Sequence, residues 1–194
     1  MRPRHWLACS VAALLAAILF QSILTRSMGL HMLLHIPLIL LAGILAMGSW
    51  LAAGRHRAGR LSRLYAKYNE YGIPGLLLCT FVAAYWMIPR SLDLVLASAP
   101  ANTLKYVGLF LAGMVLCDSL RRANSVITVF FLGNFSWMTA VAGLLYQDSS
   151  QRLCNFYLLS DQELAGRGLV VVAVVVPLAW LVAERRRLRR FLQK

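Results

Sequence analysis

Long apolar stretches, separated by short polar segments, run through nearly the whole chain. A helix crosses the hydrocarbon core of a bilayer with about 17–25 predominantly apolar residues, and six stretches come near that length. The pattern predicts an all-α integral membrane protein, a bundle of about six transmembrane helices forming one polytopic domain over residues 1–194, with spans at roughly 6–24, 31–53, 72–89, 103–120, 124–146 and 165–183.

The third stretch is expected to break at Pro89, because proline lacks an amide hydrogen and its ring clashes with the preceding helical turn. The segment 91–99 that follows carries Asp93 and is predicted to be a short amphipathic helix in the membrane interface. Small residues inside the spans permit close contact between helices; they include Ala42, Gly43, Gly108, Ala112 and Gly113.

Composition agrees with a membrane location. Hydrophobic residues make up 60% of the 194 residues, charged residues make up 14%, and the mean hydropathy is +0.67. Soluble domains are about 45–50% apolar with about a quarter of their residues charged. A soluble core of this size could not hide so much apolar surface.

The distribution of basic residues predicts the orientation, since short cytoplasmic loops collect Lys and Arg. Six spans place 15 of the 20 basic residues on one side, which makes both termini cytoplasmic. Those 15 include a basic tail, residues 184–194, which we expect to lie against anionic lipid headgroups. The other five are Arg26, Arg90, Lys105, Arg152 and Arg167.

Catalytic motifs are absent from the sequence, which has no HExxH, no GxSxG and no glycine-rich phosphate loop. We therefore expect no enzymatic activity. The net charge of +13 could suggest nucleic-acid binding, but the basic residues flank the apolar stretches, so we expect lipids and no nucleic acid as partners. Two local ion pairs are expected at helix ends, Arg90 with Asp93 and Asp118 with Arg121 or Arg122.

Two histidines, His31 and His35, stand at the start of the second span in the run HMLLH. Residues four apart share one helix face, and six spans place this face at the outer end. Imidazole suits copper and zinc, and the sulfur of Met28 or Met32 nearby favours Cu(I). The pattern predicts a soft metal site. The alternative is that both rings hydrogen-bond lipid headgroups or a neighbouring helix.

Two carboxylates, Asp161 and Glu163, precede the last span on the same outer side. Ionisable groups close to spans are rare and are functional candidates, so Asp161 is a candidate weak ligand or orienting group for a histidine. A carboxylate in the first turn also stabilises the positive end of a helix. Helix capping is therefore the alternative for both residues.

Two motifs resemble the CtaG family of cytochrome c oxidase assembly factors: HMLLH at 31–35 before a leucine-rich span, and DQELAG at 161–166 opening the last span. The family pattern departs from this chain elsewhere. Asn102 and Tyr106 stand where a second histidine pair is expected, Leu169–Val172 replaces a Met-Trp-Val-Pro run, and the family tends to have one more span. The chain is similar to a divergent member.

The resemblance implies a multi-pass protein of the bacterial inner membrane that assists copper delivery to, or maturation of, a respiratory cytochrome c oxidase. Transient Cu(I) would be its metal, and oxidase subunits and periplasmic copper donors its partners. The alternative is an accessory subunit that binds no metal and packs against a larger respiratory complex. The missing second histidine pair favours that alternative.

Overall fold

The computed structural model describes residues 3–54 and 67–192, with side chains described as far as Arg185. Over these ranges the chain is helical and contains no strand. The basic loop residues Arg55, Arg57, Arg60 and Arg63 lie outside the described residues, as does Arg2. The helices are α1 (Pro3–Leu19), α2 (Gln21–Leu24), α3 (Met28–Leu30), η1 (His31–His35), α4 (Ile36–Ala52), η3 (Glu70–Gly72), α6 (Ile73–Trp86), α7 (Pro89–Ala97), α8 (Ala99–Arg122), α9 (Ser125–Asp148) and α10 (Leu159–Leu192).

In the described ranges, four helical segments are long and apolar enough to cross a membrane: Met28–Ala52, Ala99–Arg122, Ser125–Asp148 and Leu159–Arg185. A fifth is counted if α6 and α7, which meet at a bend of 75°, form one span. The predicted first span is shorter than expected, because α1 has 17 residues and ends at Leu19. The chain is therefore an all-α, multi-pass membrane protein.

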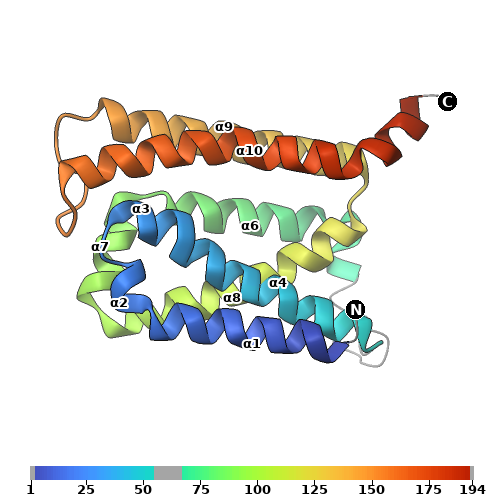
Figure 1. Ribbon diagram of the computed structural model, residues 1–194. Helices are drawn as coiled ribbons and strands as arrows, with labels where there is room; N and C mark the ends of the chain where they lie inside the picture. The colour runs from blue at the N-terminus through green and yellow to red at the C-terminus, as the bar shows by residue number, and fades with distance from the viewer. Residues whose placement is uncertain (1–2, 55–66, 193–194) are drawn as a thin grey trace.

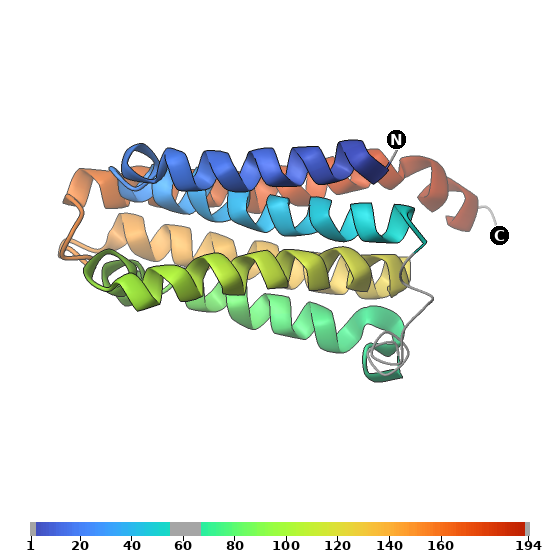
Figure 2. The same cartoon turned by 90° about the horizontal axis from the view of Figure 1, so that it is seen from below.

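The helices run roughly side by side as a bundle, with α9 and α10 forming a pair along one edge (Figure 1). Both labelled termini lie at the same end of the bundle in two perpendicular views (Figures 1 and 2). The opposite end carries α2, α3, α7 and the connection between α9 and α10 (Figure 1). We call this the outer end, following the charge-based orientation.

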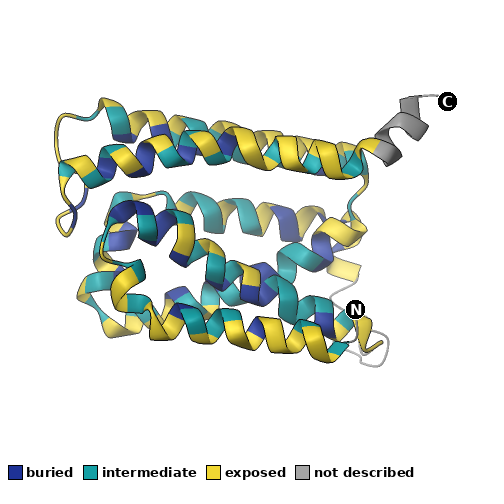
Figure 3. Ribbon diagram, in the orientation of Figure 1, coloured by how far each residue is buried: buried dark blue, intermediate teal, exposed yellow. Residues whose placement is uncertain are grey.

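The outward faces of the long helices are exposed (Figure 3), and many of the exposed side chains are large and apolar. Phe81, Trp137 and Val182 have 63%, 74% and 63% of their surface exposed. Exposed apolar surface of this extent marks contact with a membrane or a partner protein, and the length of the apolar helices favours the membrane. The interior, in contrast, holds several polar side chains, and these define the site described below.

Close contact between α4 and α8 depends on glycine. A Cβ at Gly43 would overlap the Phe110 carbonyl, and a Cβ at Gly113 would overlap the Leu40 carbonyl. The prediction of close contact is confirmed for Gly43 and Gly113. It is wrong for Gly108, because a Cβ there would meet nothing within 4 Å. That position opens onto a groove instead.

The break expected at Pro89 is present. Helix α6 ends at Trp86, and α7 begins at Pro89 in a new direction. The ion pair of Asp118 with Arg122 is confirmed, whereas the expected pair of Arg90 with Asp93 does not form. The Asp93 carboxylate instead accepts hydrogen bonds from Asn155, because the connection between α9 and α10 folds onto α7.

Candidate functional site

The HMLLH run forms one turn of π-helix, η1, inside the continuous helical segment Met28–Ala52. The Ile36 amide donates to the carbonyl of His31, five residues earlier. Pro37 follows directly and has no amide hydrogen to donate, so a regular α-helical ladder is already interrupted at this point. Turns of this kind occur often at functional sites. The two imidazoles remain on one face, with ring centroids 5.3 Å apart.

Both imidazoles are completely buried, so they do not face lipid headgroups. The hydrogen bond of His35 to Tyr106 on α8 agrees with the other half of the alternative considered from the sequence, in which the rings bond a neighbouring helix. Lys105 from α8 reaches into the space between them. Its Nζ lies 3.3 Å from Nε2 of His31 and 3.4 Å from Nδ1 of His35. Lys105 is itself fully buried. One nitrogen from each ring therefore points at the same position, and an amine occupies it.

The tautomer of His31 follows from its second partner. Tyr157 donates its hydroxyl hydrogen to the Thr25 carbonyl at 3.1 Å, so its oxygen accepts from Nδ1 of His31 at 2.9 Å. Because neutral imidazole carries one hydrogen, Nε2 of His31 presents a lone pair to Lys105. We assign His31 as the Nδ1–H tautomer.

The same reasoning applies to His35. Tyr106 donates to the Ala17 carbonyl at 2.9 Å or to Gln21 Oε1 at 3.0 Å. Nε2 of His35 donates to the Ala17 carbonyl at 3.2 Å or to the Tyr106 oxygen at 3.0 Å. Its Nδ1 therefore presents a lone pair to Lys105. The pair of imidazoles forms a receptor for a cation, with both lone pairs directed inward.

This geometry suits an ammonium group. A lysine ammonium has three donors and no acceptor, and two of the three meet imidazole nitrogens. The Nζ atom also lies 5.2 Å from the centre of the Tyr106 ring, within the distance of a cation–π contact. No carboxylate pairs with Lys105 within the described part of the chain. The buried charge is stabilised by neutral groups alone.

The connection between α9 and α10 closes the site on the outer side. Asp93 on α7 accepts from the backbone amides of Asn155, at 2.9 Å, and Phe156, at 3.4 Å. These bonds hold the loop where Tyr157 reaches His31. The Cys154 thiol is buried in the same loop and donates to the Pro89 carbonyl.

Burial raises the pKa of the Cys154 thiol to about 12, with a further contribution from the Asp93 charge. Burial also raises the pKa of Tyr157, and the charges of Asp93 and Asp161 raise it further. Both groups therefore stay neutral at physiological pH. The Tyr157 hydroxyl keeps the hydrogen that it donates to Thr25.

The other predicted ligands are Met28, Met32 and Asp161. Met28 and Met32 are buried in the apolar core. Asp161 lies in the first turn of α10, as the capping interpretation expects; its charge acts on Tyr157, and no hydrogen bond or ion pair connects it with His31. The side chains that the structure describes include no group of three or more His, Cys, Asp or Glu that could hold a metal.

Within the DQELAG motif, Gln162 makes the hydrogen bonds to the preceding loop. It is buried, accepts from the Leu153 amide at 2.8 Å and donates to the Tyr146 carbonyl at 3.1 Å. It thereby fixes the loop that carries Tyr157. The resemblance placed weight on Asp161, whereas the structure gives the positioning role to its neighbour.

Lys105 is the main functional residue that the sequence does not single out, since it is only one of five basic residues near the outer side. One signal was available. Lys105 stands in the first two turns of an apolar helix, between Asn102 and Tyr106, where the resemblance led us to expect histidines.

Comparisons of the whole chain with protein-family models, curated proteins and solved structures found no match.

Proposed function

We propose that this membrane protein captures Cu(I) as cargo at its outer end, with His31 and His35 as the ligands. One observation supports this proposal above the others. Nε2 of His31 and Nδ1 of His35 converge on one position, while the second nitrogen of each ring is held by a hydrogen bond. Such bonds to the remote nitrogen fix the tautomer and orientation of metal-binding histidines.

Lys105 makes this site exchangeable. Its ammonium lies where the metal would bind, so copper enters only when Nζ moves away, and the ammonium can return when copper leaves. A delivery protein requires such reversible capture. Met28 or Met32 would supply sulfur after a local rearrangement, and Asp161 would act through Tyr157 as an orienting group.

The cellular setting of the proposal is the bacterial inner membrane. We propose six spans with both termini in the cytoplasm, counting α1 with α2 as the first span. The resemblance supplies the client, a respiratory cytochrome c oxidase in assembly, with periplasmic copper donors and oxidase subunits as partners. The chain itself performs no catalysis in this proposal.

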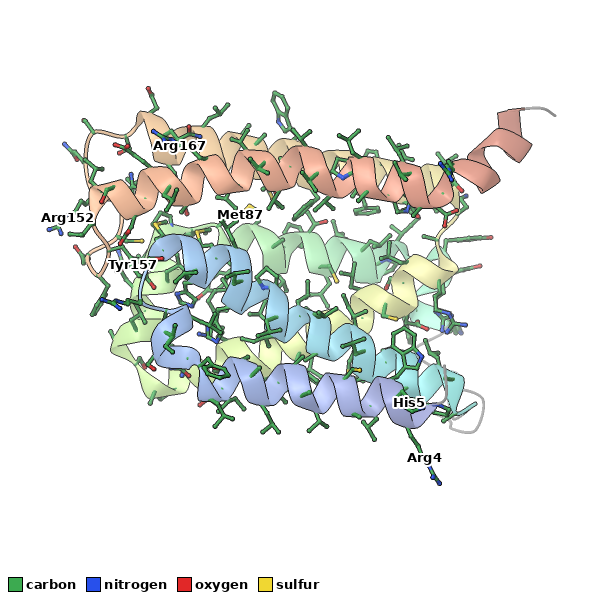
Figure 4. All side chains as sticks on the ribbon, viewed as in Figure 1. Arg4, His5, Met87, Arg152, Tyr157 and Arg167 are labelled. Atoms are coloured by element: carbon green, nitrogen blue, oxygen red, sulfur yellow. The ribbon has the colours of Figure 1, made fainter. Side chains whose placement is uncertain are left out.

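Titration of the purified protein with Cu(I), in detergent and under reducing conditions, tests the proposal. We expect one equivalent to bind to the wild type and none to the variant His31→Ala/His35→Ala. Lys105→Leu should bind Cu(I) at least as tightly as the wild type, because the competing cation is gone and leucine supplies no ligand of its own. His5→Ala is the matched control, since this exposed histidine lies at the opposite end from Tyr157 (Figure 4). Equal, weak binding by all four proteins would overturn the copper role.

The Lys105 contact also favours a second candidate function, an accessory subunit without metal. In this case the ammonium is a permanent part of the fold, and the imidazoles serve only to hold it. Deletion of the protein distinguishes the two candidates. Loss of copper from the oxidase supports delivery, whereas reduced yield of an oxidase with normal copper content supports the accessory role.

A further inference from the structure

The outer half of α6 and α8 borders an apolar groove. The two helices contact each other near the inner end, where Gly75 meets Ser119, and again where the Cys79 thiol donates to the Ala112 carbonyl. Beyond this point a groove of about 320 Å³ opens between them, roofed by α7. Its lining includes Phe81, Tyr85, Trp86, Leu94, Leu104 and Gly108.

Two features of the sequence create the groove. The 75° bend before Pro89 turns α7 away from α6, so that α7 lies against α8. Gly108 then leaves the α8 surface without a side chain, and a Cβ there would meet nothing within 4 Å. Phe81 and Leu104 on either side are 63% and 69% exposed. The groove therefore opens toward the acyl chains of the bilayer.

A positively charged residue, Arg90, neighbours this groove on α7. Arg90 is exposed on α7, one turn before the lining residue Leu94 and on the same helix face. Its expected partner, Asp93, is instead occupied by the amides of Asn155 and Phe156. The Arg90 guanidinium forms no ion pair among the side chains described. It is thus available to an external anion at the membrane interface.

We propose that this groove binds one anionic glycerophospholipid. One acyl chain fills the space above Gly108, and the phosphate binds the guanidinium of Arg90, which matches a phosphate in geometry and charge. Tyr85 and Trp86 lie at the same level, as aromatic side chains do at the border of the headgroup region. The groove is formed by other residues than the imidazole pair, so this proposal is independent of copper binding.

Photo-crosslinking tests the proposal. The full chain is placed in nanodiscs of phosphatidylcholine that contain a small fraction of phosphatidylglycerol with a diazirine on one acyl chain, and adducts are mapped by mass spectrometry. We expect adducts concentrated on the groove-lining segments of α6 and α8. Gly108→Leu fills the groove and should lower their yield at least 5-fold. Gly133→Leu is the matched control, because a Cβ at Gly133 also meets nothing within 4 Å.

The headgroup contact is tested separately. Arg90→Gln should lower the yield about 3-fold or more, whereas Arg152→Gln, which removes an equally exposed charge from the outer loop, should leave it unchanged. Adducts spread evenly over all lipid-facing helices, or an unchanged yield in Gly108→Leu, would show ordinary annular lipid and overturn the site. Equal crosslinking of a diazirine phosphatidylcholine would overturn the preference for an anionic lipid, and an unchanged yield in Arg90→Gln would overturn the role of Arg90.

Discussion

Nζ of Lys105 lies 3.3 Å from Nε2 of His31, and neither residue has any exposed surface. An unpaired ammonium in an apolar interior is costly, and it persists only where hydrogen-bond acceptors replace water. His31 and His35 provide two such acceptors because hydroxyl groups hold their N–H groups away from Lys105. The imidazole pair and the lysine therefore form one energetic unit.

A double-mutant cycle measures this coupling. His31→Ala leaves the ammonium with one imidazole acceptor, and a charged group left unsatisfied costs about 3 kcal/mol or more of stability. In a Lys105→Met background the same substitution should cost about 1–3 kcal/mol less, as is typical of residues in one network. The free energy of unfolding in detergent, measured by denaturant titration, reports both values. Gly133→Ala on α9 is the control, and it should add to His31→Ala without coupling.

Asp93 holds the connection between α9 and α10, which we call the outer loop, against α7. Its carboxylate accepts hydrogen bonds from three donors, the backbone and side-chain amides of Asn155 and the backbone amide of Phe156. In Asp93→Asn these charge-assisted bonds are lost or weakened, and because they are exposed to solvent the cost is about 0.5–1 kcal/mol each. The loop should then open more often and expose Cys154.

The rate at which maleimide modifies the Cys154 thiol measures this opening. The pKa of Cys154 is raised to about 12, so at pH 8 the folded protein holds less thiolate there than an ordinary cysteine does, and labelling gains speed as pH rises toward that value. We expect maleimide to modify Cys154 about 10-fold faster in Asp93→Asn. Asp148→Asn, an exposed carboxylate at the same end, should leave the rate unchanged. An equal increase in both variants would argue against a specific role for Asp93.

The apolar pattern predicted most of the helices because bilayer thickness constrains them strongly. The spans expected at 103–120 and 124–146 correspond to α8 and α9, and the break at Pro89 follows from proline chemistry alone. The helix ends moved by a few residues. The second span starts at Met28 instead of 31, because α3 runs without a break into the π-helical turn that begins at His31.

The site was less predictable, because it depends on contacts between distant segments. The histidine pair was visible in the sequence, but Tyr157 lies 126 residues from His31 and Lys105 lies 74 residues away. Spacing along one helix gives no information about such neighbours. Charge counting placed Lys105 near the outer side but gave no information on where its side chain points, since a single lysine in the first turns of a span looks the same whether it faces water or the bundle interior.

Any larger residue in place of Gly113, at the contact between α4 and α8, should lower the stability of the protein. Gly113→Ala places a Cβ onto the Leu40 carbonyl, so the helices must separate, and overpacking of this kind costs about 1–3 kcal/mol. Gly108→Ala lies on the same helix over open space, where replacing a helical glycine by alanine stabilises by about 0.5–1 kcal/mol. Melting temperatures in detergent should therefore shift in opposite directions. A similar shift in both variants would contradict the close approach.

Cysteine labelling in intact cells tests the proposed orientation. With the four native cysteines replaced by alanine, Arg152→Cys places a thiol in the connection between α9 and α10, and Lys67→Cys places one before η3. Both native side chains are exposed. Because basic residues are retained in the cytoplasm, a membrane-impermeant maleimide should modify position 152 in intact cells and position 67 only after permeabilisation. The reverse pattern would place the imidazole pair at the cytoplasmic end, where periplasmic copper donors have no access to it.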